Sequence, residues 1–206
     1  MEPTSILHSQ SYLEDAEHLL WLRDNSERVE KHHGIINHKL VKDNFKWLLE
    51  KYNIDGKIVG GNFFSTPIPF FVHTDSGTPE HKPDLNLVIP LKEQDDFNTV
   101  VFNQTYDGNG AHFYVGSTFK YFPDPIYNKR LEDYSEVHGC VDEPFDVDDY
   151  IRYLTHIPYA SLNGLSISEV HHWQLGKGII IPSKRLHCAS NFTGTKEGLT
   201  LLIKNG

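Results

Sequence analysis

The sequence predicts a mainly β fold of the α+β class, a β-sandwich or jelly roll preceded by supporting helices. From Ile58 onwards, short apolar runs rich in Val, Ile, Phe or Thr alternate with Gly, Pro, Asn and Asp. Before that point, the apolar residues recur at helical spacing. Many short strands at close spacing are typical of sandwiches and jelly rolls. With 206 residues the chain has the size of one domain, so we expect a single domain over 1–206.

The N-terminal part, residues 1–57, is predicted to be helical support. Ser11 and Glu14 have the spacing of a capping box at the start of a first helix. A second amphipathic helix is predicted over 38–52 and ends before Asp55-Gly56. Its apolar face consists of Leu40, Val41, Phe45, Leu48 and Leu49.

The β core is predicted over 58–206. The expected strands are the runs 62–64, 68–73, 85–91, 98–104, 111–115, 165–173, 178–181, 186–192 and 198–204. Residues 107–110 read Asp-Gly-Asn-Gly and are typical of a hairpin turn. Residues 117–159 interrupt the pattern and are rich in Tyr, Asp, Glu and Pro. We interpret them as an insertion of the kind that covers binding sites, with a short capped helix predicted over 146–154.

Charge and composition exclude several classes of function. A net charge of −9 argues against nucleic acid as a partner, because binding to phosphates needs a basic surface. No apolar run approaches the ~20 residues of a membrane-spanning helix, and the first residues do not resemble a signal peptide. The two cysteines, Cys140 and Cys188, are too few for a disulfide framework, so we expect a cytoplasmic protein. Nothing in the sequence indicates the oligomeric state.

The histidines point to metal chemistry. His73 and Asp75 form a His-x-Asp motif, and residues i and i+2 of a strand point to the same face. They would therefore offer two ligands to one divalent metal. A chain with 13 histidines is expected to contain such a tripeptide by chance, so its surroundings decide between a site and a coincidence.

The surroundings supply a third ligand and a basic residue. His187 lies near the start of a predicted strand, and Thr193-Gly194 separates this strand from the next. If Thr193-Gly194 is a two-residue turn, residue 187 pairs with 200 and residue 191 with 196. The side chains expected on one face are then those of His187, Asn191, Lys196 and Thr200.

The order His73-x-Asp75, a long gap, His187 and then Lys196 resembles the iron(II)- and 2-oxoglutarate-dependent dioxygenase superfamily. The segments 178–187 and 194–200 resemble its prolyl-hydroxylase-like branch. The resemblance covers roughly residue 69 to the C-terminus. Two features depart from the common pattern: the basic residue is Lys where much of the family has Arg, and its distance from His187 is at the short end of the usual range.

The resemblance implies a double-stranded β-helix (jelly roll, cupin-like) and an Fe(II) ion held by the catalytic residues His73, Asp75 and His187. Two His and one carboxylate leave three positions of an octahedral metal open. The resemblance implies that 2-oxoglutarate takes two of them and O2 the third. The reaction expected is hydroxylation of an unactivated C–H bond in an amino acid, peptide or small molecule, with release of succinate and CO2.

The resemblance also implies residues that bind the cosubstrate. Lys196 is expected to pair with the C5 carboxylate of 2-oxoglutarate, and Thr200 to donate a hydrogen bond to it. Asn86 and Tyr114 are further candidates. Lys184 and Arg185 are rival anchors, but they precede His187 in a turn and are expected to be exposed. Cys188 should point away from the metal, and the adjacent pair His171-His172 cannot bind one metal from one strand face.

Two other functions remain open from the sequence. One is a cupin-like metalloenzyme that does not use 2-oxoglutarate, which the role of Lys196 would distinguish. The other is a metal-free jelly-roll module that binds, for example, a carbohydrate, which metal content would distinguish.

Overall fold

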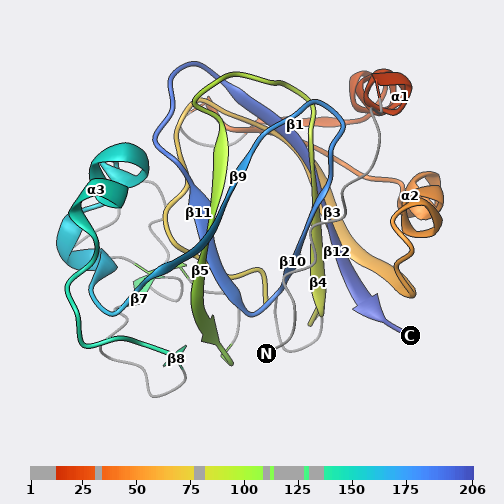
Figure 1. Ribbon diagram of the computed structural model, residues 1–206. Coiled ribbons are helices and arrows are strands. Elements are labelled where there is room, and N and C mark those ends of the chain that lie inside the picture. Colours follow the sequence, from red (N-terminus) through yellow and green to blue (C-terminus); the bar gives the residue numbers. More distant parts are fainter. Residues whose placement is uncertain (1–12, 31–33, 77–81, 109–111, 114–127, 130–136) are drawn as a thin grey trace.

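The computed structural model describes residues 13–30, 34–76, 82–108, 112–113, 128–129 and 137–206. The described chain is mainly β, and its antiparallel sheets are compatible with a β-sandwich (Figure 1). This confirms the prediction that the fold is mainly β. Within these ranges, no helix is long and apolar enough to cross a membrane.

The larger sheet has six strands, and the last strand of the chain lies inside it. The strand order is β1 (Arg28–Glu30), β2 (Ile36–His38), β3 (Gly56–Thr66), β12 (Lys196–Asn205), β4 (Leu85–Pro90) and β10 (Ile179–Pro182), all antiparallel. Side chains alternate between the two faces of β12. Leu199 and Leu201 pack in the cluster that includes the helices, whereas Lys196 and Thr200 line a cavity.

The smaller sheet is built around β5 (Asn98–Tyr106). This strand pairs with β11 (Arg185–Ala189), β9 (Ile167–His172) and β8 (Val137–His138), and each pair is antiparallel. A separate parallel pair consists of β6 (His112–Phe113) and β7 (Asn128–Lys129).

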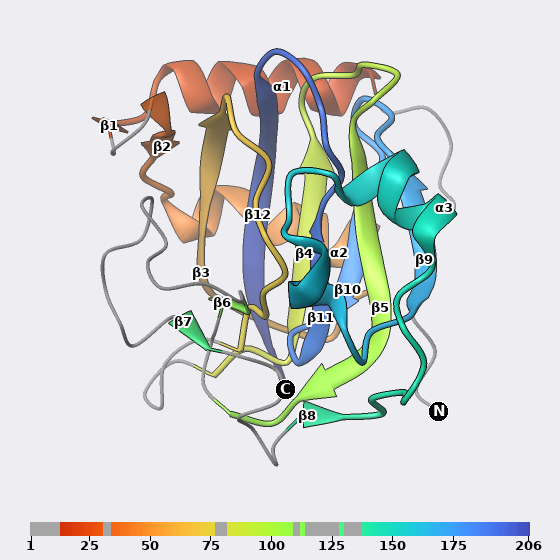
Figure 2. The ribbon, with the colours of Figure 1, turned by 90° about the vertical axis from the view of Figure 1, so that its left-hand side faces the viewer.

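Helical segments cover both outer faces. Figure 1 shows α1 (Leu13–Asp24) and α2 (Lys46–Lys51) beside the larger sheet, and α3 (Val147–Asp149) on the opposite side, near the smaller sheet. Figure 2 shows α1 crossing the ends of the central strands. The remaining helical turns are η2 (Lys42–Phe45), η5 (Tyr150–Leu154) and η6 (Tyr159–Leu162).

Three apolar clusters hold these layers together. In one, Leu19 and Leu48 of the helices pack on strands of the larger sheet. In the second, Leu154 packs with Phe102 on the smaller sheet. The third contains Trp173 and residues of both sheets, and it fills part of the space between them.

The N-terminal part is less helical than predicted. α1 is where the first helix is expected, although Ser11 lies outside the described residues. The second helix is shorter, because 38–52 contains the end of β2, the turn η2 and the short helix α2. Strands β1 and β2 were not predicted, since each has only three residues and gives little alternation to detect.

The expected strand over 68–73 is wrong. Instead of a strand, the segment makes an isolated antiparallel bridge between His73 and His187, and Phe70 O accepts from Ala189 N at 3.3 Å. Pro67 and Pro69 lack backbone N–H groups, and a strand cannot extend its ladder through such positions.

The expected hairpin between residues 187 and 200 is also wrong. β11 pairs with β5, while β12 pairs with β3 and β4 in the other sheet. The connection crosses between the sheets, and within it Asp96 accepts hydrogen bonds from Thr193 N at 2.7 Å and Thr193 Oγ1 at 3.0 Å. These bonds fix the turn beside the start of β5.

The described end of the predicted insertion is part of the core. A short capped helix is present, as expected, and its cap is Asp146, whose Oδ1 accepts from Asp149 N at 2.9 Å. Phe145 and Leu154 are buried against the smaller sheet. Of the earlier part, 117–136, only 128–129 lies within the described residues.

Candidate metal centre

His73, Asp75 and His187 meet, as the sequence predicts. Their ligand atoms all lie within 4.8 Å of one another. The backbones of His73 and His187 exchange two hydrogen bonds, His73 N to His187 O at 2.9 Å and the reverse at 3.1 Å. Asp75 N donates to Ser183 O at 3.1 Å, which ties the carboxylate to the turn before β11. The three residues therefore converge through backbone pairing with β11 and not through alternation along one strand.

Backbone carbonyls orient both imidazole rings. His73 Nδ1 lies 2.7 Å from Phe71 O, and His187 Nδ1 lies 2.9 Å from Arg185 O. A carbonyl oxygen only accepts, so each Nδ1 carries the proton and Nε2 is the coordinating nitrogen. Metal-binding histidines commonly have this support. His73, Asp75 and His187, called the metal group below, fit a divalent metal with two nitrogen ligands and one oxygen ligand.

The charges of the group are mutually dependent. Burial raises the pKa of Asp75, but hydrogen bonds and positive charge from His187, with His73 and Asn86, lower it well below its ordinary value. Burial lowers the pKa of His187, but the hydrogen bond and negative charge of Asp75 together raise it by more. The net shift of this pKa is therefore upward. His187 Nε2 lies 3.1 Å from Asp75 Oδ2. A bound metal would replace the His187 proton as the positive partner of Asp75.

A chain of hydrogen bonds supports the Asp75 carboxylate. Thr200 Oγ1 donates to Asn86 Oδ1 at 2.6 Å, and Asn86 Nδ2 donates to Asp75 Oδ2. The Thr200 hydroxyl proton is therefore directed at Asn86, whereas the resemblance directs it at the cosubstrate. Asn86 and Thr200 belong to the outer support of the metal group.

A cavity of about 290 Å³ contains the metal group and extends between the two sheets. Six of the predicted site residues line it: His73, Asp75, Asn86, His187, Lys196 and Thr200. Tyr114, the other predicted residue, lies outside the described residues. The cavity also has an apolar section that includes Phe64, Val88 and Trp173.

Lys196 is a buried cation in this cavity. Lys196 is 3% exposed, and its Nζ donates to Asn98 O at 2.6 Å. Nζ also lies 3.9 Å from the centre of the Trp173 ring. Burial lowers the pKa of Lys196 to about 7, against smaller raising effects of Cys188 and Asp96. Within the described ranges no carboxylate forms an ion pair with Lys196, so a ligand carboxylate is the partner that its position suits.

The other sequence candidates do not belong to the metal group. Lys184 is exposed and pairs with Asp107 at 2.7 Å, and Arg185 donates to Asn103 O at 2.7 Å. His171 is buried beside Glu169 at 3.2 Å, and His172 is exposed. Cys188 packs in the apolar cluster on the smaller sheet, as predicted, and its atoms also border the cavity.

Asn191 is not among the residues that line the cavity. Its backbone N–H donates to Tyr153 O at 2.6 Å, on the side of the helical segments. The predicted register failed here because β11 ends at Ala189 and the chain then crosses to the other sheet.

Trp173 and Thr99 are the main cavity residues that the sequence did not reveal. Trp173 Nε1 donates to Thr99 Oγ1 at 2.8 Å, and both residues line the cavity. Alternation along the strand of residues 98–104 groups Thr99 with Val101 on one face. Only the pairing of β5 with β9 brings that face to Trp173.

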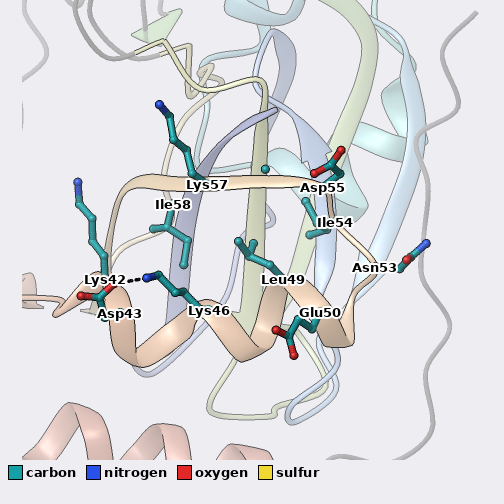
Figure 3. Close-up of a pocket in the computed structure, with 11 residues that line it drawn as sticks. Lys42, Asp43, Lys46, Leu49, Glu50, Asn53, Ile54, Asp55, Lys57 and Ile58 are labelled. Carbon is teal, nitrogen blue, oxygen red and sulfur yellow. Dashed lines mark ion pairs between the residues drawn. The ribbon is translucent and has the colours of Figure 1, made fainter. Parts of the chain in front are cut away.

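A second and larger depression, of about 640 Å³, lies between α2 and the start of β3 (Figure 3). Three of its charged groups have partners in the protein: Lys46 pairs with Asp43 at 2.6 Å, and Lys42 Nζ donates to Val59 O at 2.6 Å. None of the predicted site residues lines it. The smaller cavity is therefore the better candidate, because the titratable groups with displaced pKa values converge there.

No family model matches the chain, and no curated protein matches its sequence. The chemistry of the site is therefore inferred from its own residues.

Proposed function

We propose that the protein is an Fe(II)- and 2-oxoglutarate-dependent oxygenase that hydroxylates an unactivated C–H bond of an amino acid, peptide or small molecule. One observation carries the proposal: a His-Asp-His group and a buried lysine without a carboxylate partner among the described residues share one cavity. Two His and one carboxylate are typical of non-haem Fe(II) oxygenases. The lysine suits the far carboxylate of a dicarboxylic cosubstrate.

The strand order supports a double-stranded β-helix. β3, β12, β4 and β10 are neighbours in one sheet. The His73 segment, β11, β5 and β9 are neighbours in the other. Along the chain these segments switch repeatedly between the sheets, which is how a jelly roll is connected.

In this proposal, separate residues of the chain bind the metal and the cosubstrate. His73 and His187 bind the metal through Nε2, and Asp75 binds through its carboxylate, held by Asn86. When bound, the metal supplies the redox chemistry that couples decarboxylation of 2-oxoglutarate to hydroxylation. Lys196 binds and orients the C5 carboxylate. Phe64 and Val88 exclude water from the section between the two ends.

An anaerobic titration tests the proposal. Fe(II) and then 2-oxoglutarate are added to metal-free protein, and the visible metal-to-ligand charge-transfer band of the chelated 2-oxo acid is recorded. The wild-type protein should give the band, His73→Ala should not, and Lys196→Ala should need far more 2-oxoglutarate. His172→Ala is the matched control, because this exposed histidine on β9 does not line the cavity.

The other results identify the alternatives. Metal binding without the band would favour a cupin-like metalloenzyme that does not use 2-oxoglutarate. Absence of both metal and band would favour a metal-free binding module. After a positive band, succinate release identifies substrates among amino acids, peptides and small molecules. Because the net charge is −9, we do not expect nucleic acids to be substrates, and they are screened last.

A further inference from the structure

We infer that Trp173 is the positioning residue of the carboxylate subsite: its ring face holds the Lys196 ammonium, and with Phe64 it sets the length of dicarboxylate that fits. This inference rests on the proposed function, and it adds a residue that determines which 2-oxo acid is accepted.

The first support is the position of the Lys196 ammonium. Nζ lies 3.9 Å from the centre of the Trp173 ring, and it donates to Asn98 O at 2.6 Å. The ring of Phe192 is farther away, with its centre 5.8 Å from Nζ. An ammonium group has three donors, of which the backbone carbonyl takes one. The ring face attracts the cation without consuming a donor, so donors remain for a ligand carboxylate in the cavity that Lys196 lines.

The second support is that Trp173 is itself fixed. Its Nε1 donates to Thr99 Oγ1 at 2.8 Å, and its backbone N donates to Phe97 O at 2.8 Å. The ring packs edge-on against Phe64, with a centroid distance of 6.1 Å. Trp173 is 2% exposed. A ring held on these sides gives Lys196 a rigid support.

The third support is the shape of the section between Lys196 and Thr200. Gly198 lies between them on the same face of β12. A Cβ at Gly198 would come within 2.8 Å of Phe64 Cζ and 3.0 Å of Trp173 Cη2. The two rings therefore lie directly on the strand, with no side chain beneath them. They are an apolar part of the wall of the cavity that Lys196 and the His-Asp-His group also line, and this part suits the methylene groups of a 2-oxo dicarboxylic acid.

The test measures ligand affinity for two acids that differ by one methylene, 2-oxoglutarate and 2-oxoadipate. Each is titrated anaerobically into Fe(II)-loaded wild-type protein, Trp173→Leu, Trp173→Phe and Phe97→Leu. Phe97→Leu is the matched control, because Phe97 packs on Trp173 in the same cluster but does not line the cavity. Fe(II) affinity is measured for every variant.

We expect Trp173→Leu to bind 2-oxoglutarate about 30-fold more weakly, since a desolvated cation–π contact is lost. Trp173→Phe retains an aromatic face but is smaller. It should lose about fivefold in 2-oxoglutarate affinity and shift the preference towards 2-oxoadipate. Fe(II) affinity should stay within about twofold in all variants, and Phe97→Leu should leave both acids within about threefold.

Three results would overturn the inference: unchanged affinities and length preference in Trp173→Leu, equal losses in Trp173→Leu and Phe97→Leu, or loss of Fe(II) affinity together with acid affinity. If Trp173→Leu does not fold, Trp173→Phe decides. If wild-type protein binds Fe(II) but no 2-oxoglutarate, the proposed function fails separately. Glutarate, which lacks the 2-oxo group, then tests the subsite: binding that Trp173→Phe weakens supports it, and absence of binding overturns it.

Discussion

At one end of the cavity, His73 and His187 are oriented by hydrogen bonds that they donate to backbone carbonyls, and Asp75 by a hydrogen bond from Asn86. At the other end, Lys196 lies on the Trp173 ring with a single backbone oxygen as hydrogen-bond acceptor. The first end fixes its groups by directional hydrogen bonds, which suits a metal with strict geometry. The second fixes one flexible cation by an aromatic surface. Under the proposed function, these two means of preorganisation would prepare one cavity for a metal cation at one end and a carboxylate at the other.

The largest expected effect comes from removing a proposed metal ligand. His187→Ala should lower divalent-metal affinity by more than about 100-fold, since loss of an outer-shell partner alone commonly costs 10–100-fold. Isothermal titration with Fe(II) under anaerobic conditions measures this, with His172→Ala as the control. Tight metal binding by His187→Ala would show that the three residues do not form the site.

The second prediction concerns Lys196, at the other end of the cavity. Lys196→Met should raise the free energy of unfolding of the ligand-free protein by ~2 kcal/mol at pH 7, because it replaces a buried charge by an apolar side chain of similar length. Its carboxylate binding should be lost while metal affinity is retained. Chemical denaturation measures the stability.

The stability gain of Lys196→Met should depend on pH, because the pKa of Lys196 differs between the folded and unfolded chain. Lys196 has a pKa of about 7 in the folded protein against an ordinary value of 10.5. Between these values, the unfolded chain binds more protons, so the stability contributed by this group rises with pH. The advantage of Lys196→Met should therefore shrink as the pH increases from 7 towards 10. Exposed Lys184→Met is the control, and an equal gain there would contradict the explanation.

The sequence correctly predicted that His73, Asp75 and His187 converge, but it predicted the wrong backbone pairing for them. His73, Asp75 and His187 were identified from order and spacing, yet the strand expected to carry His73 is interrupted by prolines. Lys196 and Thr200 were assigned to the site through a hairpin that does not form. Both face the cavity because alternation along one strand is local, and it survives an error in strand pairing. Trp173 was missed, since its contact with Lys196 depends on two strands in different sheets.

The third prediction concerns the charge of Lys196. A carboxylate binds the protonated amine, and the pKa of Lys196 is lowered to about 7 by burial. Affinity for 2-oxoglutarate in metal-loaded protein should therefore be greatest below pH 7 and fall by up to about tenfold per pH unit above it. Lys196→Arg stays charged and should give a flatter profile over the same range. A wild-type profile that is flat from pH 7 to 9 would contradict the lowered pKa.

The smallest expected effect is that of Thr200→Val on metal affinity. Thr200→Val keeps the shape of the side chain but removes the hydroxyl that donates to Asn86 at 2.6 Å. Loss of one neutral hydrogen bond corresponds to about fivefold, and the structure directs this bond to the support of Asp75. Metal affinity should therefore fall about fivefold, with 2-oxoglutarate affinity at saturating metal nearly unchanged. The opposite result, unchanged metal affinity with weaker 2-oxoglutarate binding, would assign the hydroxyl to the cosubstrate carboxylate. Thr200 would then belong with Lys196 at the anion end, and Asn86 would need another reason to keep its amide directed at Asp75.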